Sequence, residues 1–337
     1  MAKKQLIVPI FIPHQGCPYR CVFCNQTEIS GQDKKADRDK VLKPLQSYLK
    51  TLPLEELPEY REAAFYGGTF TGLPIDRQKY LLSLLQPWLE DGSIHAIRVS
   101  THSLFIDSEK LELLKTNGVK TVELGVQSTD SEVLKHAGRE TPMELLSKSA
   151  ALIKKNDFKL GLQLMPGLPG DTVQKFIKSV NDVLEMKPDF VRLYPALVIR
   201  NTALHDMYNK GEYRPWDLGK TIEALSIAVK KFTKAGVPVI RIGLHPEPSL
   251  LEGYVDGPIH PSIRYLVDCK ISLEKMIGIL NMQEKLPDKV LFKVPSKQVS
   301  TYTGHKKENI IKLKDQFSLG EVSVQSGNDN CELELVA

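Results

Sequence analysis

Residues 5–24 read QLIVPIFIPHQGCPYRCVFC, and this stretch decides the fold. The apolar run at 5–13 predicts a buried first strand, which the motif Cys17-x3-Cys21-x2-Cys24 follows directly. Three thiolates on one short loop can converge on one metal centre. Zinc normally takes a fourth ligand, for which His14 is a candidate. A [4Fe–4S] cluster held by only three cysteines instead leaves one iron open to bind another molecule.

Composition and cysteine count restrict the class of protein. The chain has 337 residues, of which 42% are hydrophobic and 26% charged. These ordinary globular values exclude collagen-like, low-complexity and wholly disordered chains. The five cysteines are an odd number, and Cys269 and Cys331 stand far from the motif, so a disulfide framework is implausible. No apolar run reaches the roughly 18 residues of a membrane span, and no signal-peptide cleavage site follows the N-terminal run, which predicts a cytoplasmic protein without a membrane partner.

Strand and helix patterns alternate along most of the chain. Apolar residues at helical spacing separate most of the β-rich runs, and Asp107, Asp130 and Asp171 are candidate helix N-caps. Repeated strand–helix units build a parallel sheet with right-handed crossovers, which places the fold in the α/β class. The expected strands are 5–13, 61–68, 94–101, 121–127, 158–165, 190–197 and 237–245, and the expected helices are 76–91, 107–117, 141–156, 171–186 and 217–235.

Four of the expected strands carry polar groups on one face and aliphatic residues on the other. Arg98, Ser100 and His102 alternate in one strand, and a second strand places Glu123 and Gln127 at the same kind of spacing. A solvated antiparallel sheet also alternates, but it would lack a helix after nearly every strand. We therefore predict a full or partial (β/α) barrel with a polar lumen, in preference to an open sheet. Two further strands add Arg192, Tyr194, Arg241, Gly243 and His245 to the polar face.

The chain is expected to divide near residue 245. Residues 1–245 would form the barrel, and 246–337 a small α+β extension with a helix at 262–284 and strands at 289–294 and 319–324. The junction at 246–261 holds four prolines and two glycines, which predicts an irregular connecting loop. Eight lysines against two acidic residues lie between Lys285 and Lys314. This basic stretch predicts either a surface that binds RNA phosphates or a solvated lysine face.

The cysteine triplet, with Phe23 just before the third cysteine and the loop leaving the first strand of a βα barrel, resembles the radical S-adenosylmethionine (SAM) superfamily. The resemblance implies that Cys17, Cys21 and Cys24 hold a [4Fe–4S] cluster whose open iron binds SAM. It also implies that an electron from an external flavodoxin- or ferredoxin-like donor cleaves SAM, and that the resulting 5′-deoxyadenosyl radical abstracts a hydrogen atom from the substrate. The protein would supply orientation, exclusion of water and a shaped lumen.

Further motifs resemble the SAM-binding segments of that superfamily. The segment YGGT at 66–69 is similar to its glycine motif, whose backbone meets the SAM amino group. By the same resemblance Gln127 would face the ribose or methionyl region of SAM, and Arg139 would meet its carboxylate. The segment 165–170 would offer backbone groups and apolar surface to the adenine. The SAM-binding residues implied are Phe23, Gly67, Gly68, Thr69, Ser100, Gln127, Arg139, Gln163 and Pro166.

Within the superfamily, the segments ELGVQS (123–128) and VRLYPALVIR (191–200) resemble the catalytic subunit of the elongator complex, over about residues 7–245. Two features differ from that subunit. The residues after 246 would be too few for its acetyltransferase domain, and Ser100 stands where the subunit usually has a glutamate. A related short enzyme type, queuine lyase, resembles this layout and acts on a 7-deazaguanine base. The resemblance thus implies that the substrate is a tRNA base, a related modified base or another small metabolite.

The polar lumen supplies candidate catalytic residues for that substrate, namely His102, Glu123, Tyr194, Arg241 and His245. We predict a radical SAM enzyme of the elongator-like type. The alternative is a non-catalytic RNA-binding protein stabilised by zinc or a cluster, with zinc on the three cysteines and His14 and the basic stretch on RNA phosphates. The sequence leaves the oligomeric state open.

Overall fold

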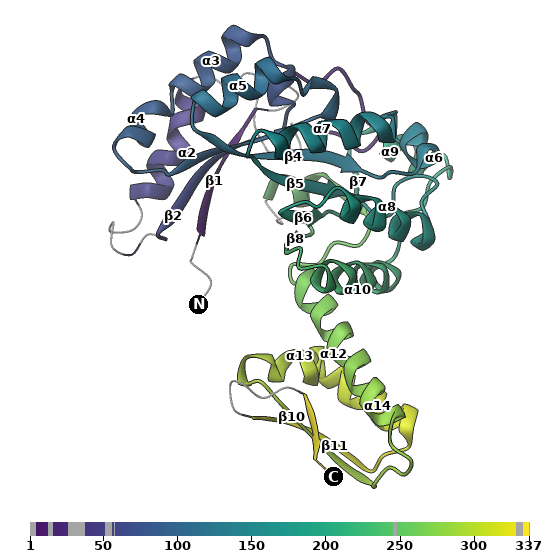
Figure 1. Ribbon diagram of the computed structural model, residues 1–337. Coiled ribbons are helices and arrows are strands. Elements are labelled where there is room, and N and C mark those ends of the chain that lie inside the picture. Colours follow the sequence, from purple (N-terminus) through teal and green to yellow (C-terminus); the bar gives the residue numbers. More distant parts are fainter. Residues whose placement is uncertain are drawn as a thin grey trace. The chain divides into compact units, whose positions relative to one another are not determined.

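Seven parallel strands form the main sheet of the computed structural model, in the order β1-β2-β3-β4-β5-β6-β8. The structure describes residues 5–12, 16–25, 38–50, 56, 58–244, 248–327 and 333–336. The sheet curls into a half-barrel, with helices on its outer side and β1 and β8 as its end strands (Figure 1). The predicted α/β fold with a partial barrel is confirmed. The strands are β1 (Gln5–Phe11), β2 (Tyr60–Tyr66), β3 (Ala96–Thr101), β4 (Val119–Gln127), β5 (Lys159–Leu164), β6 (Phe190–Leu193) and β8 (Val239–Ile242).

Side-chain caps explain where several of the helices begin. Asp107 caps α5 by accepting a hydrogen bond from Lys110 N at 2.9 Å, and Asp130 caps α6 by accepting from Val133 N at 3.1 Å, both as predicted. The prediction for Asp171 is wrong, because Thr172 caps α8 and Asp171 instead accepts from Gly167 N at 2.8 Å within the preceding loop. The helices are α2 (Arg38–Lys50), α3 (Ile75–Ser83), α4 (Gln86–Glu90), α5 (Ser108–Thr116), α6 (Ser131–His136), α7 (Met143–Lys155), α8 (Val173–Glu185), α9 (Ala203–Asn209) and α10 (Leu218–Lys234).

The proline-rich junction contains regular structure, so the prediction of an irregular loop there is wrong. α11 (Pro248–Gly253) and β9 (Tyr254–Asp256) lie within it, and β9 pairs antiparallel with β7 (Val198–Ile199). Pro248 occupies the first position of α11, where the missing N–H group would have had no partner inside the helix. The prolines therefore bracket these short elements and do not interrupt them.

By their contacts, the residues divide into two compact units. One unit contains Met1–Trp216 and Phe232–Pro258, and the other contains Asp217–Lys231 and Ile259–Ala337. α10 thus contributes residues to both units. These limits differ from the predicted division at residue 245, and the assignment of functional domains stays a prediction.

The second unit has a small α+β core of its own. β10 (Lys289–Val294) pairs parallel with β11 (Glu321–Ser326) and antiparallel with β12 (Glu334–Val336). Phe292 of β10 is fully buried among side chains of α12 (Ile263–Asn281), α13 (Val299–Thr303) and α14 (Glu308–Phe317). In the ranges that the structure describes, no helix is long and apolar enough to cross a membrane.

Candidate active site

A cavity with a volume of about 230 Å³ lies at the carboxyl ends of the half-barrel strands. Each strand, or the loop directly after it, contributes lining residues, as expected for a site at the C-terminal end of parallel strands. Twelve of the predicted site residues line it, namely Cys17, Cys21, Phe23, Cys24, Gly67, Gly68, Thr69, Ser100, Gln127, Arg139, Gln163 and Tyr194. The sequence motifs therefore converge on one cavity.

The cysteine loop is fixed between two other segments of the same unit. Val22 N donates to the carbonyl oxygen of Ala137 at 3.0 Å, and Leu204 N donates to the carbonyl oxygen of Val22 at 2.8 Å. The Val22 and Phe23 side chains pack on the buried Leu168 and Ala196, which anchors the loop on its apolar side. Backbone hydrogen bonds and apolar packing thus both hold the loop at the cavity.

The thiols fit an iron–sulfur cluster by their chemistry. Cys17, Cys21 and Cys24 all line the cavity, and Cys21 is buried. Nowhere in the described ranges are three His, Cys, Asp or Glu side chains close enough together for a single metal ion. A cluster is larger than one ion and is held by thiolates alone, so an all-thiol donor set around one cavity suits it. His14, the predicted fourth zinc ligand, lies outside the described residues.

Arg139 connects the cysteine loop to β4. Its Nη1 atom lies 3.6 Å from Cys21 Sγ, and its Nη2 atom donates to the carbonyl oxygen of Gly125. Burial raises the pKa of the Cys21 thiol, whereas the Arg139 guanidinium acts to lower it. Arg139 therefore stabilises the thiolate form that a cluster requires.

The end of β4 has an unusual backbone. Gln127 has φ of 68°, in the left-handed region that residues with a side chain rarely adopt. The register between β4 and β5 shifts between Gly125 and Gln127, and Gln163 Nε2 donates to Gln127 Oε1 at 3.2 Å. The bulge re-aims the two amide side chains, and both line the cavity.

Four charged side chains form a buried ladder inside the half-barrel, which we call the charge ladder: Glu62, Arg98, Glu123 and Arg192. Arg98 Nη2 lies 2.5 Å from Glu62 Oε2, and Arg98 Nη1 lies 2.6 Å from Glu123 Oε1. Arg192 Nε lies 2.8 Å from Glu123 Oε2. Two carboxylates and two guanidinium groups balance, so the ladder carries no net charge.

Two tyrosines join the charge ladder to the cavity. Arg192 Nη2 donates to Tyr66 OH at 2.7 Å, and Arg192 Nη1 donates to Tyr194 OH at 3.1 Å. Both tyrosines line the cavity, whereas neither Arg192 nor Glu123 does. Burial, and then the Glu123 carboxylate, raise the pKa of Tyr66 far above its usual range, so this phenol stays protonated.

Two further predicted catalytic residues that the structure describes, His102 and Arg241, do not line the cavity. His102 is buried, and it accepts from Leu104 N at 3.1 Å and stacks on Tyr19 with ring centroids 4.8 Å apart. Burial, and then Arg139, lower the pKa of His102 to about 3, so its imidazole is neutral at ordinary pH. Arg241 is half-buried and donates to the carbonyl oxygen of Gly243 at 3.2 Å. His245 lies outside the described residues.

Catalytic roles for His102, Glu123, Arg241 and His245 stay predictions. Pro166, a predicted SAM contact, also lies off the cavity lining. Its carbonyl oxygen accepts a hydrogen bond from Ala196 N at 2.9 Å. It thereby ties the loop after β5 to the segment after β6.

Sequence reasoning missed several lining residues. Tyr66 continues the period-two pattern of Glu62 and Ala64, a signal that could have placed it on the inner face. Tyr19 lies between two of the cysteines and could have been found from that position alone. The other missed lining residues are mostly apolar or small, and they include Phe11, Thr101, Pro195, Leu197, Ile199 and Leu244.

Comparison with family models identifies the superfamily of the chain. Residues 11–183 match the model of the Radical SAM superfamily, and residues 188–275 match the Radical SAM C-terminal domain. The first match covers half of the chain. The chain therefore belongs to the radical SAM superfamily, and it is an enzyme. That family implies SAM and a [4Fe–4S] cluster as cofactors.

Several relatives are elongator-like. The chain is 33% identical to the tRNA uridine(34) acetyltransferase of Methanocaldococcus jannaschii over 136 residues, which are 40% of this chain and 25% of that protein. It is 27% identical to human Elongator complex protein 3 over 191 residues, covering 50% of this chain and 35% of that protein. It is 25% identical to the heme chaperone HemW of Bacillus subtilis over 224 residues, covering 66% of this chain and 59% of that protein.

The fold resembles that of a solved elongator protein. The archaeal Methanocaldococcus infernus Elp3 with an N-terminal deletion superposes with a TM-score of 0.64 at 22% identity, covering 83% of this chain and 64% of that chain. This likeness concerns the fold alone. The chain matches about a quarter to a third of the length of the elongator and tRNA acetyltransferase relatives.

Proposed function

We propose that this radical SAM enzyme acts on an uncharged nucleobase, and that a uridine base of tRNA is the first candidate. The observation that carries the proposal is the charge of the cavity. Among its lining residues in the described chain, Arg139 alone has a charged side chain other than the cysteine thiols. The ladder beneath the two tyrosines is neutral overall, because its two acidic and two basic side chains are paired.

In this proposal, Cys17, Cys21 and Cys24 hold the cluster, while Gln127 and Arg139 hold SAM. When bound, the reduced cluster and SAM supply a 5′-deoxyadenosyl radical that abstracts a hydrogen atom. The backbone at Gly67 and Gly68 presents no side chain to the cavity, so a ligand can approach its N–H and C=O groups closely. The protein's share of the reaction is to orient both ligands and to keep water out.

The polar lining groups other than Arg139 favour a neutral substrate. If Arg139 meets the carboxylate of SAM, the other polar lining groups are hydroxyls and amides, among them Ser100, Thr101, Gln163 and Tyr194. A carboxylate-rich substrate would bury charges there without a cationic partner, at a cost of several kcal/mol per ion. An uncharged heterocycle with carbonyl and N–H groups has no such penalty.

A tRNA substrate draws further support from the basic stretch and from the relatives. Six of the eight lysines between Lys285 and Lys314 are exposed. In this stretch Lys289 forms an ion pair with Glu321, and Lys312 forms one with Glu308. Exposed lysines attract RNA phosphates. The tRNA uridine(34) acetyltransferase relative is named for a tRNA uridine. A free modified base is the second candidate, since the cavity itself would accept it equally.

Two further parts of the proposal concern the setting of the reaction. The electron comes from an external flavodoxin- or ferredoxin-like donor, and the enzyme works in the cytoplasm. The family assignment favours this catalytic role over a non-catalytic zinc-stabilised RNA-binding protein.

The test is substrate-dependent formation of 5′-deoxyadenosine. Protein reconstituted anaerobically with iron and sulfide is given dithionite and SAM, with unmodified tRNA transcripts, free uridine or no addition. We expect tRNA to raise the rate severalfold above the rate without substrate, and a tetracarboxylate porphyrinogen to leave it unchanged. Stimulation by the porphyrinogen, or by neither tRNA nor uridine, would contradict the proposal.

A further inference from the structure

The hydrogen bonds of Arg192 fix the direction of the bonds around it. A guanidinium group has five N–H donors and no acceptor. In the contacts of Arg192 Nη2 with Tyr66 OH (2.7 Å) and of Arg192 Nη1 with Tyr194 OH (3.1 Å), both phenol oxygens must therefore accept. Each tyrosine is left with one O–H hydrogen to donate.

The two tyrosines differ in where that hydrogen goes. Tyr66 OH donates to Glu123 Oε1 at 3.1 Å, so its hydrogen is used inside the ladder. For Tyr194, the part of the chain that the structure describes offers no acceptor within hydrogen-bond distance of its hydroxyl, although Tyr194 lines the cavity. The hydrogen-bonding capacity of such a hydroxyl at a cavity wall is incomplete until a ligand or water accepts its hydrogen.

We infer that Tyr194 is a fixed hydrogen-bond donor that recognises a carbonyl oxygen of the substrate base. The inference rests on the proposed function and adds a specificity-determining residue to it. Uracil presents two such oxygens, and a base with an amino group at the same place would set a donor against a donor. Sites that supply a hydrogen bond reject partners that cannot complete it far more strongly than apolar pockets reject a change of size.

The charge ladder keeps the Tyr194 hydroxyl acting as a donor toward the substrate and not as an acceptor. Arg192 is held through Glu123, and Glu123 through Arg98, which itself lies 2.5 Å from Glu62. Arg98 is also supported by the Phe190 ring, with its guanidinium carbon 4.8 Å from the ring centroid. These contacts hold the Arg192 side chain in place. Arg192 therefore keeps donating to the Tyr194 oxygen, and this oxygen is not left free to accept a hydrogen bond from the substrate.

The experiment is a double-mutant cycle between Tyr194 and the substrate carbonyl. Unmodified tRNA is transcribed with uridine, with 2-thiouridine or with 4-thiouridine, because a thiocarbonyl is a weaker hydrogen-bond acceptor. The tRNA dependence of 5′-deoxyadenosine formation is measured for the wild type, for Tyr194→Phe and for the control Tyr80→Phe. Tyr80 is an exposed tyrosine of α3 outside the cavity.

We expect one of the two thio-substitutions to lower kcat/KM about tenfold in the wild type and in Tyr80→Phe, as for the loss of one buried hydrogen bond. With ordinary tRNA, Tyr194→Phe should lower kcat/KM about as much as that thio-substitution does in the wild type. Combining Tyr194→Phe with that thio-tRNA should lower kcat/KM little further. If the thio-substitution lowers kcat/KM by the same factor in the wild type and in Tyr194→Phe, the inference is overturned, while tRNA remains the substrate. A wild type that neither tRNA nor free uridine stimulates would overturn the proposed function itself. If Tyr194→Phe binds less iron than the wild type, Tyr194→Met provides the same cycle.

Discussion

At the scale of single residues, Gly16 brings the cysteine loop against the glycine motif. A Cβ atom added at Gly16 would lie 2.8 Å from Leu73 N and closer still to the carbonyl oxygen of Thr69. Gly16 also has φ of +73°, a left-handed conformation that costs little only for glycine. Its missing side chain therefore lets the loop with Cys17 lie directly on the main chain of residues 69–73.

We expect Gly16→Ala to lower the iron content of the reconstituted protein, and its free energy of unfolding by more than about 2 kcal/mol, because a main-chain clash adds to the backbone strain. Gly92→Ala is the matched control. Gly92 has the same φ of +73°, and no atom of the described chain lies within 4 Å of its added Cβ. That variant should lose only about 1–2 kcal/mol and keep its iron. Equal iron contents in the two variants would contradict the account.

His102 shows where the residue-level prediction stops. The alternation of Arg98 and Ser100 predicts that His102 faces the lumen, but β3 ends at Thr101 and the period-two rule ends with it. His102 instead caps the short turn Ser103–Phe105 through its ring nitrogen. Cys17, Gly67 and Gln127 could be predicted because their motifs are continuous in sequence. The partners of Glu123 could not, since they come from three other strands, β2, β3 and β6.

At the scale of elements, the charge ladder ties four strands of the half-barrel together. Glu62 lies on β2, Arg98 on β3, Glu123 on β4 and Arg192 on β6. The Arg98 and Glu62 side chains are 4% and 0% exposed, so water does not screen their interaction. Such a group is neutral as a whole, yet removing one member leaves buried charge without a partner.

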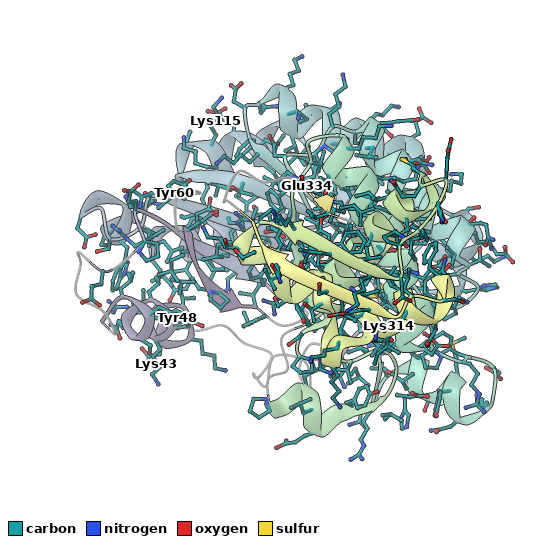
Figure 2. The ribbon with its side chains drawn as sticks, turned by 90° about the horizontal axis from the view of Figure 1, so that it is seen from below. Lys43, Tyr48, Tyr60, Lys115, Lys314 and Glu334 are labelled. Carbon is teal, nitrogen blue, oxygen red and sulfur yellow. The ribbon has the colours of Figure 1, made fainter. Side chains whose placement is uncertain are left out.

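We expect Arg98→Met to lower the free energy of unfolding by about 3–5 kcal/mol, because two buried carboxylates lose a partner at once. Lys115→Met is the control. Lys115 Nζ lies 3.2 Å from Asp157 Oδ2 on the surface, and Figure 2 shows it at the edge of the molecule. Its loss should cost less than about 1 kcal/mol. Anaerobic denaturant unfolding of both variants measures the difference, and similar values for the two would show that the ladder does not stabilise the sheet.

The elements that sequence reasoning missed are the short ones. β7 and β9 have two and three residues, and they pair across more than fifty positions of sequence. Neither is long enough to show a periodic pattern, and proline and glycine around β9 favour a loop. The long helices and the parallel strands, in contrast, each span enough residues for their spacing to be recognised.

At the scale of the whole molecule, the strand–helix rhythm was enough to predict an α/β fold with parallel strands. Whether the barrel closes could not be predicted, because closure depends on the tilt and register of all strands together. The sheet ends at β1 and β8, and the cysteine loop after β1 reaches the segment around Leu204 that follows β6. The half-barrel thus leaves its cavity lined by loops as well as strands.

The central claim is that Cys17, Cys21 and Cys24 hold a four-iron cluster that cleaves SAM. The most direct measurement combines iron analysis, absorbance and 5′-deoxyadenosine formation on anaerobically reconstituted protein, with Cys21→Ala beside the wild type. For the wild type we predict about four irons per chain, absorbance at about 400 nm, and formation of 5′-deoxyadenosine after reduction in the presence of SAM. All three should be lost in Cys21→Ala. A colourless protein that binds zinc, or one that binds four irons and never cleaves SAM, would contradict the account.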